Sequence, residues 1–141
     1  MAAMKEALTA ADRILIPVPP SQADVWATQR FLHIVGPDIE AVKANGRQQT
    51  MAFVNRADTN KSIRETHETE AALRMLPGID VVLPHRLRTR TGFRRSLSEG
   101  QTVFEMSPRS QAANELRTLA EALYPNLASE TLPRQEAGEA R

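Results

Sequence analysis

The chain has 141 residues, 41% of them hydrophobic, with 18 basic and 17 acidic side chains and a formal net charge of only +1 at pH 7. This length leaves room for one domain of moderate core size, and the balanced charge excludes a chain that is polycationic throughout. The absence of cysteine excludes disulfides, thiolate nucleophiles and cysteine-ligated metals.

The first predicted unit is a strand followed by a capped helix. Arg13–Val18 is an apolar run without polar alternation, which predicts a strand covered on both faces. Prolines within and after this run end the ladder and turn the chain. Ser21 and Asp24 have the spacing of a capping box, and we expect a helix over 22–35 that Gly36-Pro37 breaks. A strand followed by a helix in this way is typical of a parallel α/β sheet. In such sheets, the functional residues lie in loops at the carboxyl ends of the strands.

Two further strands are predicted to alternate with helices. One or two more helical turns over 39–44 precede a second strand at 48–55, and a helix over 62–76 precedes a third strand at 79–83. Strands and helices that alternate at these intervals predict βαβ crossovers. The expected fold class is therefore α/β, with a parallel sheet of about three strands and flanking helices.

After the third strand the predicted elements become shorter. We expect a short helix around 92–99, a brief extended piece over 101–105, and a helix over 108–124 that begins at Ser107-Pro108. From residue 125 the sequence is polar and without periodicity, which predicts a disordered tail over 125–141 behind a domain of residues 1–124.

A cluster of arginines follows the third predicted strand. Its members are Arg86, Arg88, Arg90, Arg94 and Arg95. The nearest downstream acid is Glu99, so these cations cannot all pair with acids nearby in the sequence. Guanidinium groups suit phosphate contacts that need no base readout, which favours sequence-independent DNA binding with steep salt dependence. The alternative is a solvated basic helix paired with glutamates of neighbouring elements.

Four stretches of the chain resemble the carboxyl-terminal half of the ParA/MinD-like family of partition ATPases, deviant P-loop proteins that segregate plasmids and chromosomes. They are 10–21 (AADRILIPVPPS) with 24–27 (DVWA), 53–56 (FVNR), 100–105 (GQTVFE) and 107–113 (SPRSQAA). The resemblance runs from about residue 7 to 124. It implies part of a P-loop-type parallel sheet.

The resemblance also implies roles for individual residues. It implies that Asn55 contacts the adenine of a nucleotide and that Pro84 and Arg86 line the same base pocket, whereas a plain alternative for Asn55 is a cap at the strand end that turns the loop toward Asp58. It further implies that DNA is held by residues of the arginine cluster, for which we name Arg88, Arg90, Arg94 and Arg95.

The chain departs from the family pattern in its phosphate chemistry. Its six glycines are scattered, and no Gly-x-x-x-x-Gly-Lys-Ser/Thr motif is present to cradle phosphates. The family's magnesium-associated carboxylate strand would precede the first residue. We therefore expect ATP and Mg²⁺ to bind only if the missing half is supplied, with no metal site and no hydrolysis by this chain alone. Whether it is part of an enzyme stays open.

Three functions remain in view. The first is a ParA-like plasmid or chromosome partition segment that contributes adenine-side contacts and nonspecific DNA binding. The second is a DNA-binding module without nucleotide chemistry, and the third is a regulatory protein that pairs with an intact partition ATPase. The expected partners are nonspecific DNA, a second copy or an intact ParA-like protein, and a ParB-like adaptor. No apolar run reaches membrane-span length, so we expect no membrane partner and a cytoplasmic, nucleoid-associated protein.

Overall fold

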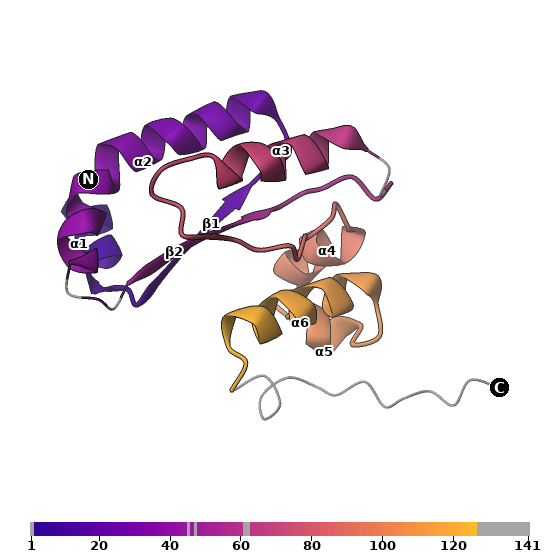
Figure 1. Cartoon of the computed structure of the whole chain (residues 1–141). Coiled ribbons are helices and arrows are strands. Elements are labelled where there is room, and N and C mark those ends of the chain that lie inside the picture. Colours follow the sequence, from indigo (N-terminus) through magenta and orange to yellow (C-terminus); the bar gives the residue numbers. More distant parts are fainter. Residues whose placement is uncertain (1, 45, 47, 61–62, 127–141) are drawn as a thin grey trace.

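The computed structural model describes residues 2–44, 46, 48–60 and 63–126. Its elements in chain order are α1 (Ala2–Ala10), β1 (Arg13–Val18), α2 (Gln22–Lys43), β2 (Gln49–Val54), α3 (Arg64–Arg74), β3 (Val81–Val82), α4 (Thr91–Glu99), α5 (Val103–Met106) and α6 (Gln111–Leu123) (Figure 1). The tail expected beyond residue 125 falls almost wholly outside the described residues. Among the described helices, none is long and apolar enough to cross a membrane.

The strands form one parallel sheet in the order β1-β2-β3. Ile16 pairs with Ala52, and Ala52 pairs in turn with Val82. The α/β class and the three parallel strands are confirmed. The third strand is shorter than the expected 79–83, although hydrogen bonds from Asp80 N–H to the Thr50 carbonyl and from Leu83 N–H to the Ala52 carbonyl, both 2.8 Å, continue the pairing on either side.

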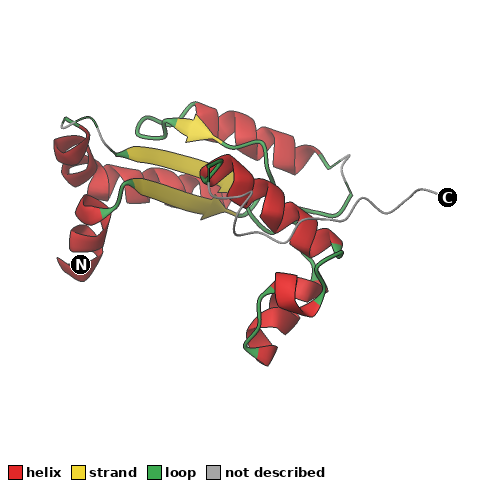
Figure 2. Ribbon diagram, turned by 90° about the horizontal axis from the view of Figure 1, so that it is seen from below, coloured by secondary structure: helices red, strands yellow, loops and turns green. Residues whose placement is uncertain are grey.

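Helices cover the two faces of the sheet unequally. α2 and α3, with α1 beside α2, lie on one face, and α4, α5 and α6 lie on the other (Figures 1 and 2). On the α2 side, Ile14 packs with Val35 and Ile39, all three buried. On the opposite face, Phe53 of β2 packs against Leu119 of α6. Burial of these apolar side chains is the main force that holds the helices to the sheet.

The expectation that β1 is covered on both faces is wrong for this chain. Ile14 and Val18 are buried under the α2 side, but Leu15 is 36% exposed and Pro17 is exposed on the other face. α6 packs over β2 and β3, and its carboxyl end reaches β1 at Arg13, which lies over the Tyr124 ring. Leu15 and Pro17 stay exposed. β1 is also an edge strand, with β2 as its neighbour on one side only among the described strands.

The predicted break at Gly36-Pro37 is also wrong, because α2 continues through Pro37 to Lys43. An interior proline removes one helical hydrogen bond and crowds the preceding turn, at a cost of roughly 3 kcal/mol. Val35 and Ile39 bracket the proline and are 0% and 2% exposed. Their packing against β1 and α1 offsets that cost, since tertiary contacts stabilise most protein helices. The predicted cap is confirmed, because the Ser21 hydroxyl accepts the Asp24 N–H at 3.1 Å.

The carboxyl-terminal helices differ from the expectation at two points. Residues 101–105, expected to be extended, contain the start of α5, which has a complete capping box between Thr102 and Glu105. α6 begins at Gln111 rather than at Pro108, because the Ser110 hydroxyl accepts the Ala113 N–H at 3.2 Å and caps the helix there. The helix expected around 92–99 is confirmed as α4, which ends at the left-handed Gly100.

Candidate functional site

Asn55 lies directly after β2, at the carboxyl edge of the sheet where parallel α/β proteins bind ligands. Its backbone N–H donates to the Val18 carbonyl at 2.9 Å, which ties the residue to the end of β1. The side chain is half-buried, and its amide makes no hydrogen bond to any other described residue. Because the backbone is fixed and the side-chain amide has no partner among the described residues, the amide can form hydrogen bonds with a ligand that offers both a donor and an acceptor.

Arg56, the next residue, has a left-handed backbone with φ of 55°. This conformation is unfavourable for a residue other than glycine, by about 1 kcal/mol or more. It redirects the chain so that Ala57, 1% exposed, pairs in parallel with Arg88. The Ala57 N–H donates to the Leu87 carbonyl at 3.0 Å, and the Thr89 N–H donates to the Ala57 carbonyl at 2.9 Å. The arginine-bearing segment 86–90 is thus held as an extension of the sheet beside the loop that follows β2.

The three residues expected around a base are only partly brought together. The Leu87 N–H donates to the Val54 carbonyl at 3.1 Å, so the segment that contains Arg86 runs beside the end of β2, next to Asn55. Pro84 and Arg86 share a pocket of about 280 Å³ with side chains of α6. Asn55 does not line that pocket. Pro84 and Arg86 therefore share one pocket beside α6, and Asn55 lies outside it.

Arg86 is not an open cation. Its guanidinium forms an ion pair with Glu70 of α3, with 2.9 Å between Nε and Oε1, and contacts His67 Nδ1 at 3.3 Å. The Glu70 side chain is 4% exposed and that of Arg86 is 18% exposed. A carboxylate this deeply buried needs its partner, so the pair fixes the segment after β3 to α3.

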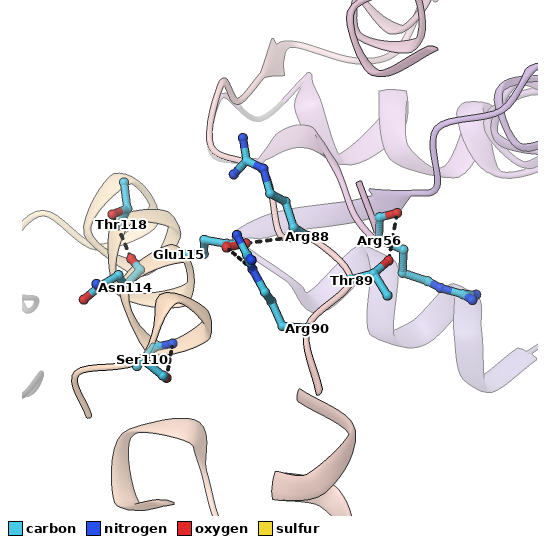
Figure 3. Close-up of polar contacts among 9 residues, drawn as sticks. Arg56, Arg88, Thr89, Arg90, Ser110, Asn114, Glu115 and Thr118 are labelled. Carbon is cyan, nitrogen blue, oxygen red and sulfur yellow. Dashed lines mark hydrogen bonds and ion pairs between the residues drawn. The ribbon is translucent and has the colours of Figure 1, made fainter. Parts of the chain in front are cut away.

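Glu115 of α6 holds the next part of the cluster. Its Oε1 accepts the Arg88 backbone N–H at 2.8 Å, and its Oε2 accepts Arg90 Nε at 3.1 Å. Figure 3 shows the carboxylate of Glu115 between these two residues, with the Arg88 side chain directed away from it. Arg88 Nε is buried and has no hydrogen-bond partner among the described atoms. The pairing of Arg90 follows the alternative in which glutamates of neighbouring elements neutralise part of the cluster.

Arg94 and Arg95 are different, because both are exposed on α4 and neither forms an ion pair with another described residue. Of the four arginines expected to contact DNA, these two have guanidinium groups that are open to solvent. Arg88 has its backbone fixed, and Arg90 is engaged with Glu115. α4 therefore carries two exposed cations at consecutive positions.

The amino-terminal edge of the sheet carries a different charge pair. The Asp80 carboxylate accepts the Thr50 N–H at 2.7 Å and pairs with Lys43 Nζ at 2.8 Å. Burial raises the pKa of Asp80, but hydrogen bonds from Lys43 and Thr50 and the lysine charge outweigh it and hold the pKa below its ordinary value of 3.8. This pair joins the end of α2 to the sheet, away from the candidate site.

Sequence reasoning missed the two glutamates that organise the arginines. Each lies on the packed face of its helix: Glu70 is one turn from Thr66 and Leu73, which are buried, and Glu115 lies between Ala112 and Leu119, also buried. An acidic residue on the packed face of a helix needs a hydrogen-bond or ion-pair partner there, and that position was the available signal. The sequence did not indicate which arginine pairs with each glutamate, because the pairing depends on the path of the chain after β3.

Comparisons with known proteins give one distant similarity. Over 116 residues the chain is 27% identical to "Maintenance of carboxysome distribution protein A" of Halothiobacillus neapolitanus, a match that covers 82% of this chain and 50% of that relative. The chain thus spans about half the length of the curated relative that it matches. No protein-family model matches the chain. No solved structure matches it either. The similarity to a protein named for maintaining a distribution hints at the same ParA/MinD-like family as the sequence resemblance.

Proposed function

We propose that this chain is the adenine-side and DNA-contacting part of a ParA/MinD-like positioning protein. The observation that carries the proposal is the similarity, over most of the chain, to a protein named for maintaining carboxysome distribution. The parallel sheet with helices on both faces is compatible with the family resemblance. In this role the chain acts on the position of a cargo such as a plasmid, a chromosome or another large body.

The residues present fit half of a nucleotide site. Asn55 offers a half-buried amide without a partner among the described residues, which suits the edge of an adenine ring. Pro84 supplies apolar surface in the pocket that it shares with Arg86, and Arg86 fixes the loop through Glu70. The sequence offers no phosphate loop, and the described residues contain no cluster of acids and histidines placed for a metal. ATP with Mg²⁺ would need groups from another polypeptide segment, so hydrolysis is not assigned to this chain.

The second part of the proposal is nonspecific DNA binding through α4, with localisation to the nucleoid. Arg94 and Arg95 lie side by side in the sequence on an exposed helix, and neither is neutralised by a described acid. Contacts of this kind depend on phosphates rather than on base identity. The proposed partners are therefore DNA, a second copy or an intact ParA-like protein, and a ParB-like adaptor that couples the cargo.

Retention on DNA-cellulose of mixed sequence tests this function. We expect the wild-type chain to be retained at low salt and the double variant Arg94→Gln with Arg95→Gln to elute with the flow-through. The matched control is Arg64→Gln with Arg74→Gln on α3, which removes the same charge from the opposite face of the sheet and should leave retention unchanged. A wild-type chain that is not retained contradicts the proposal.

One observation favours a second candidate, a regulatory module that pairs with an intact partition ATPase. β1 is an edge strand with Leu15 exposed on it, a surface that could receive another chain. An adenine-nucleotide titration separates the candidates. The first predicts binding that is lost in Asn55→Ala when the missing half is supplied in trans, and the second predicts that the mutation has no effect.

A further inference from the structure

A second pocket lies between α4, α5 and the start of α6, separate from the one that Pro84 and Arg86 line. Its volume is about 330 Å³, at the lower end of the range for small-ligand sites. Val103 and Met106 of α5 supply apolar surface, and Arg90 and Arg95 are the charged residues of its lining. No acidic residue lines it. The pocket therefore favours a ligand that combines an anionic group with an apolar body.

The backbone around this pocket adds to its positive character. α4 begins at Thr91 without a side-chain cap, so the N–H groups of its first turn have no side-chain acceptor at the pocket edge. α6 begins at the same pocket, with Ser110 and Gln111 in the lining. The two helix starts approach closely because position 92 is glycine: a Cβ there would lie 3.2 Å from the Ala112 Cβ. Both helix dipoles and both guanidinium groups thus act on one cavity.

Glu115 holds one of these two cations, Arg90, in position. It binds Arg90 through Nε alone, which leaves the terminal guanidinium nitrogens without a described partner while the side chain stays in place at the pocket wall. Arg95, which also lines the pocket, has no acidic partner among the described residues. An arginine held by one nitrogen and open at the others is prepared to receive a second oxyanion.

We propose that this α4–α5–α6 pocket binds one sugar–phosphate unit, with the phosphate between Arg90 and Arg95 and the sugar against Val103 and Met106. The inference deepens the proposed DNA contact and rests on it: one phosphate enters a built pocket, and Arg94 supplies only an outer contact. The same chemistry could receive a free nucleoside monophosphate, so the experiment includes both sources.

The test compares neighbouring residues by fluorescence anisotropy with a labelled mixed-sequence duplex. Arg95→Gln removes a pocket cation, and Arg94→Gln, one residue away and outside the lining, is its charge-matched control. We expect Arg95→Gln to weaken binding about tenfold, as loss of a charge-assisted hydrogen bond does, and Arg94→Gln to weaken it less than about threefold. Gln111→Trp fills the pocket without changing charge and should also weaken binding about tenfold. Gln101→Trp, exposed and outside the lining, should not.

Equal losses in Arg94→Gln and Arg95→Gln, or full binding by Gln111→Trp, overturn the inference, while leaving the proposed DNA contact intact. Deoxythymidine monophosphate supplies the independent probe, read from ¹H–¹⁵N spectra of the whole chain. We expect it to shift the N–H signals of Thr91, Gly92 and Gln111, and these shifts should disappear in Arg95→Gln. If the duplex does not bind but the monophosphate gives these shifts, the pocket stands and the proposed function fails. Without these shifts the pocket assignment is wrong.

Discussion

The guanidinium of Arg90 and the carboxylate of Glu115 join the segment after β3 to α6, with Nε and Oε2 3.1 Å apart. The same carboxylate accepts the Arg88 N–H through its other oxygen. One glutamate thereby positions two arginines of the cluster, Arg88 and Arg90. Glu115 lines the pocket that contains Arg86, and its partner Arg90 lines the pocket that contains Arg95.

Loss of this carboxylate should destabilise the fold. Glu115→Ala removes both hydrogen bonds and leaves Arg90, whose side chain is 21% exposed, without its partner. We expect the free energy of unfolding to fall by about 2 kcal/mol, below the cost of breaking a fully buried pair. Urea denaturation gives the value, and Glu121→Ala, at an exposed position of the same helix, is the control. A change no larger than that of the control would contradict the structural role of Glu115.

Stability should depend on the Asp80 carboxylate in acid. Its pKa is lower in the folded protein than its ordinary value of 3.8, so its contribution to stability is full above that pH and is lost as pH falls through the folded pKa. Asp80→Asn should therefore lower the urea midpoint near neutral pH and flatten its fall below pH 3.8. The control is Asp12→Asn, an exposed position outside this ion pair. An unaltered acid profile in Asp80→Asn would rule out this linkage.

The outer edge of β1 should promote association. Hydrogen bonds from Gln49 N–H to the Asp12 carbonyl and from Asn55 N–H to the Val18 carbonyl show that even-numbered residues of β1 point their backbone groups at β2. Odd-numbered residues therefore point theirs outward, and Pro17, which has no N–H, is one of them. Leu15 keeps an outward N–H and an exposed apolar side chain. The outer edge can pair with another strand.

Sedimentation velocity at micromolar concentration tests this edge. We expect the wild-type chain to associate or to need a partner for solubility, and Leu15→Lys to shift it toward monomer, because a charged edge strand resists pairing. Trp26→Lys removes an exposed apolar side chain from α2, away from the edge of β1, and should leave association unchanged. A well-behaved wild-type monomer would refute the prediction.

Replacement of the helix-interior proline should stabilise the protein. Pro37 is exposed and lies within α2, where it lacks the N–H for a helical hydrogen bond. Pro37→Ala restores that bond, and the greater freedom of the unfolded chain offsets part of the gain. We expect an increase of about 1–2 kcal/mol in the free energy of unfolding by urea. No increase would mean that packing around the proline requires its shape.

Local signals in the sequence were sufficient for the sheet and for the first helix cap. An apolar run at β1, an apolar half-strand at β2 and the Ser21 cap each follow from a few adjacent residues. The helix through Pro37 was not predictable in this way, because its continuity depends on how Val35 and Ile39 pack against β1 and α1. The start of α5 was readable in principle, since Thr102 and Glu105 have capping-box spacing.

The sequence was sufficient to predict which residues form the candidate site, but not how their side chains are arranged and paired. The arginines were visible in the sequence, and so was the polar residue after β2. The ion pairs of these arginines were not visible in the sequence. Glu70 is 16 residues from Arg86 along the chain, and Glu115 is 25 residues from Arg90. The left-handed Arg56 gave no signal either, since no glycine or asparagine marks it. Tertiary contacts therefore decide which cations remain open for a ligand.

The salt dependence of DNA binding tests the central claim most directly. The affinity of the wild-type chain for a mixed-sequence duplex should fall steeply with salt, and each arginine–phosphate contact should contribute about one to the slope of log K against log salt. We expect Arg94→Gln with Arg95→Gln to reduce that slope by about two and the α3 control pair to leave it unchanged. Binding that does not depend on salt, or the same slope in all three proteins, would contradict a DNA-contacting role for α4.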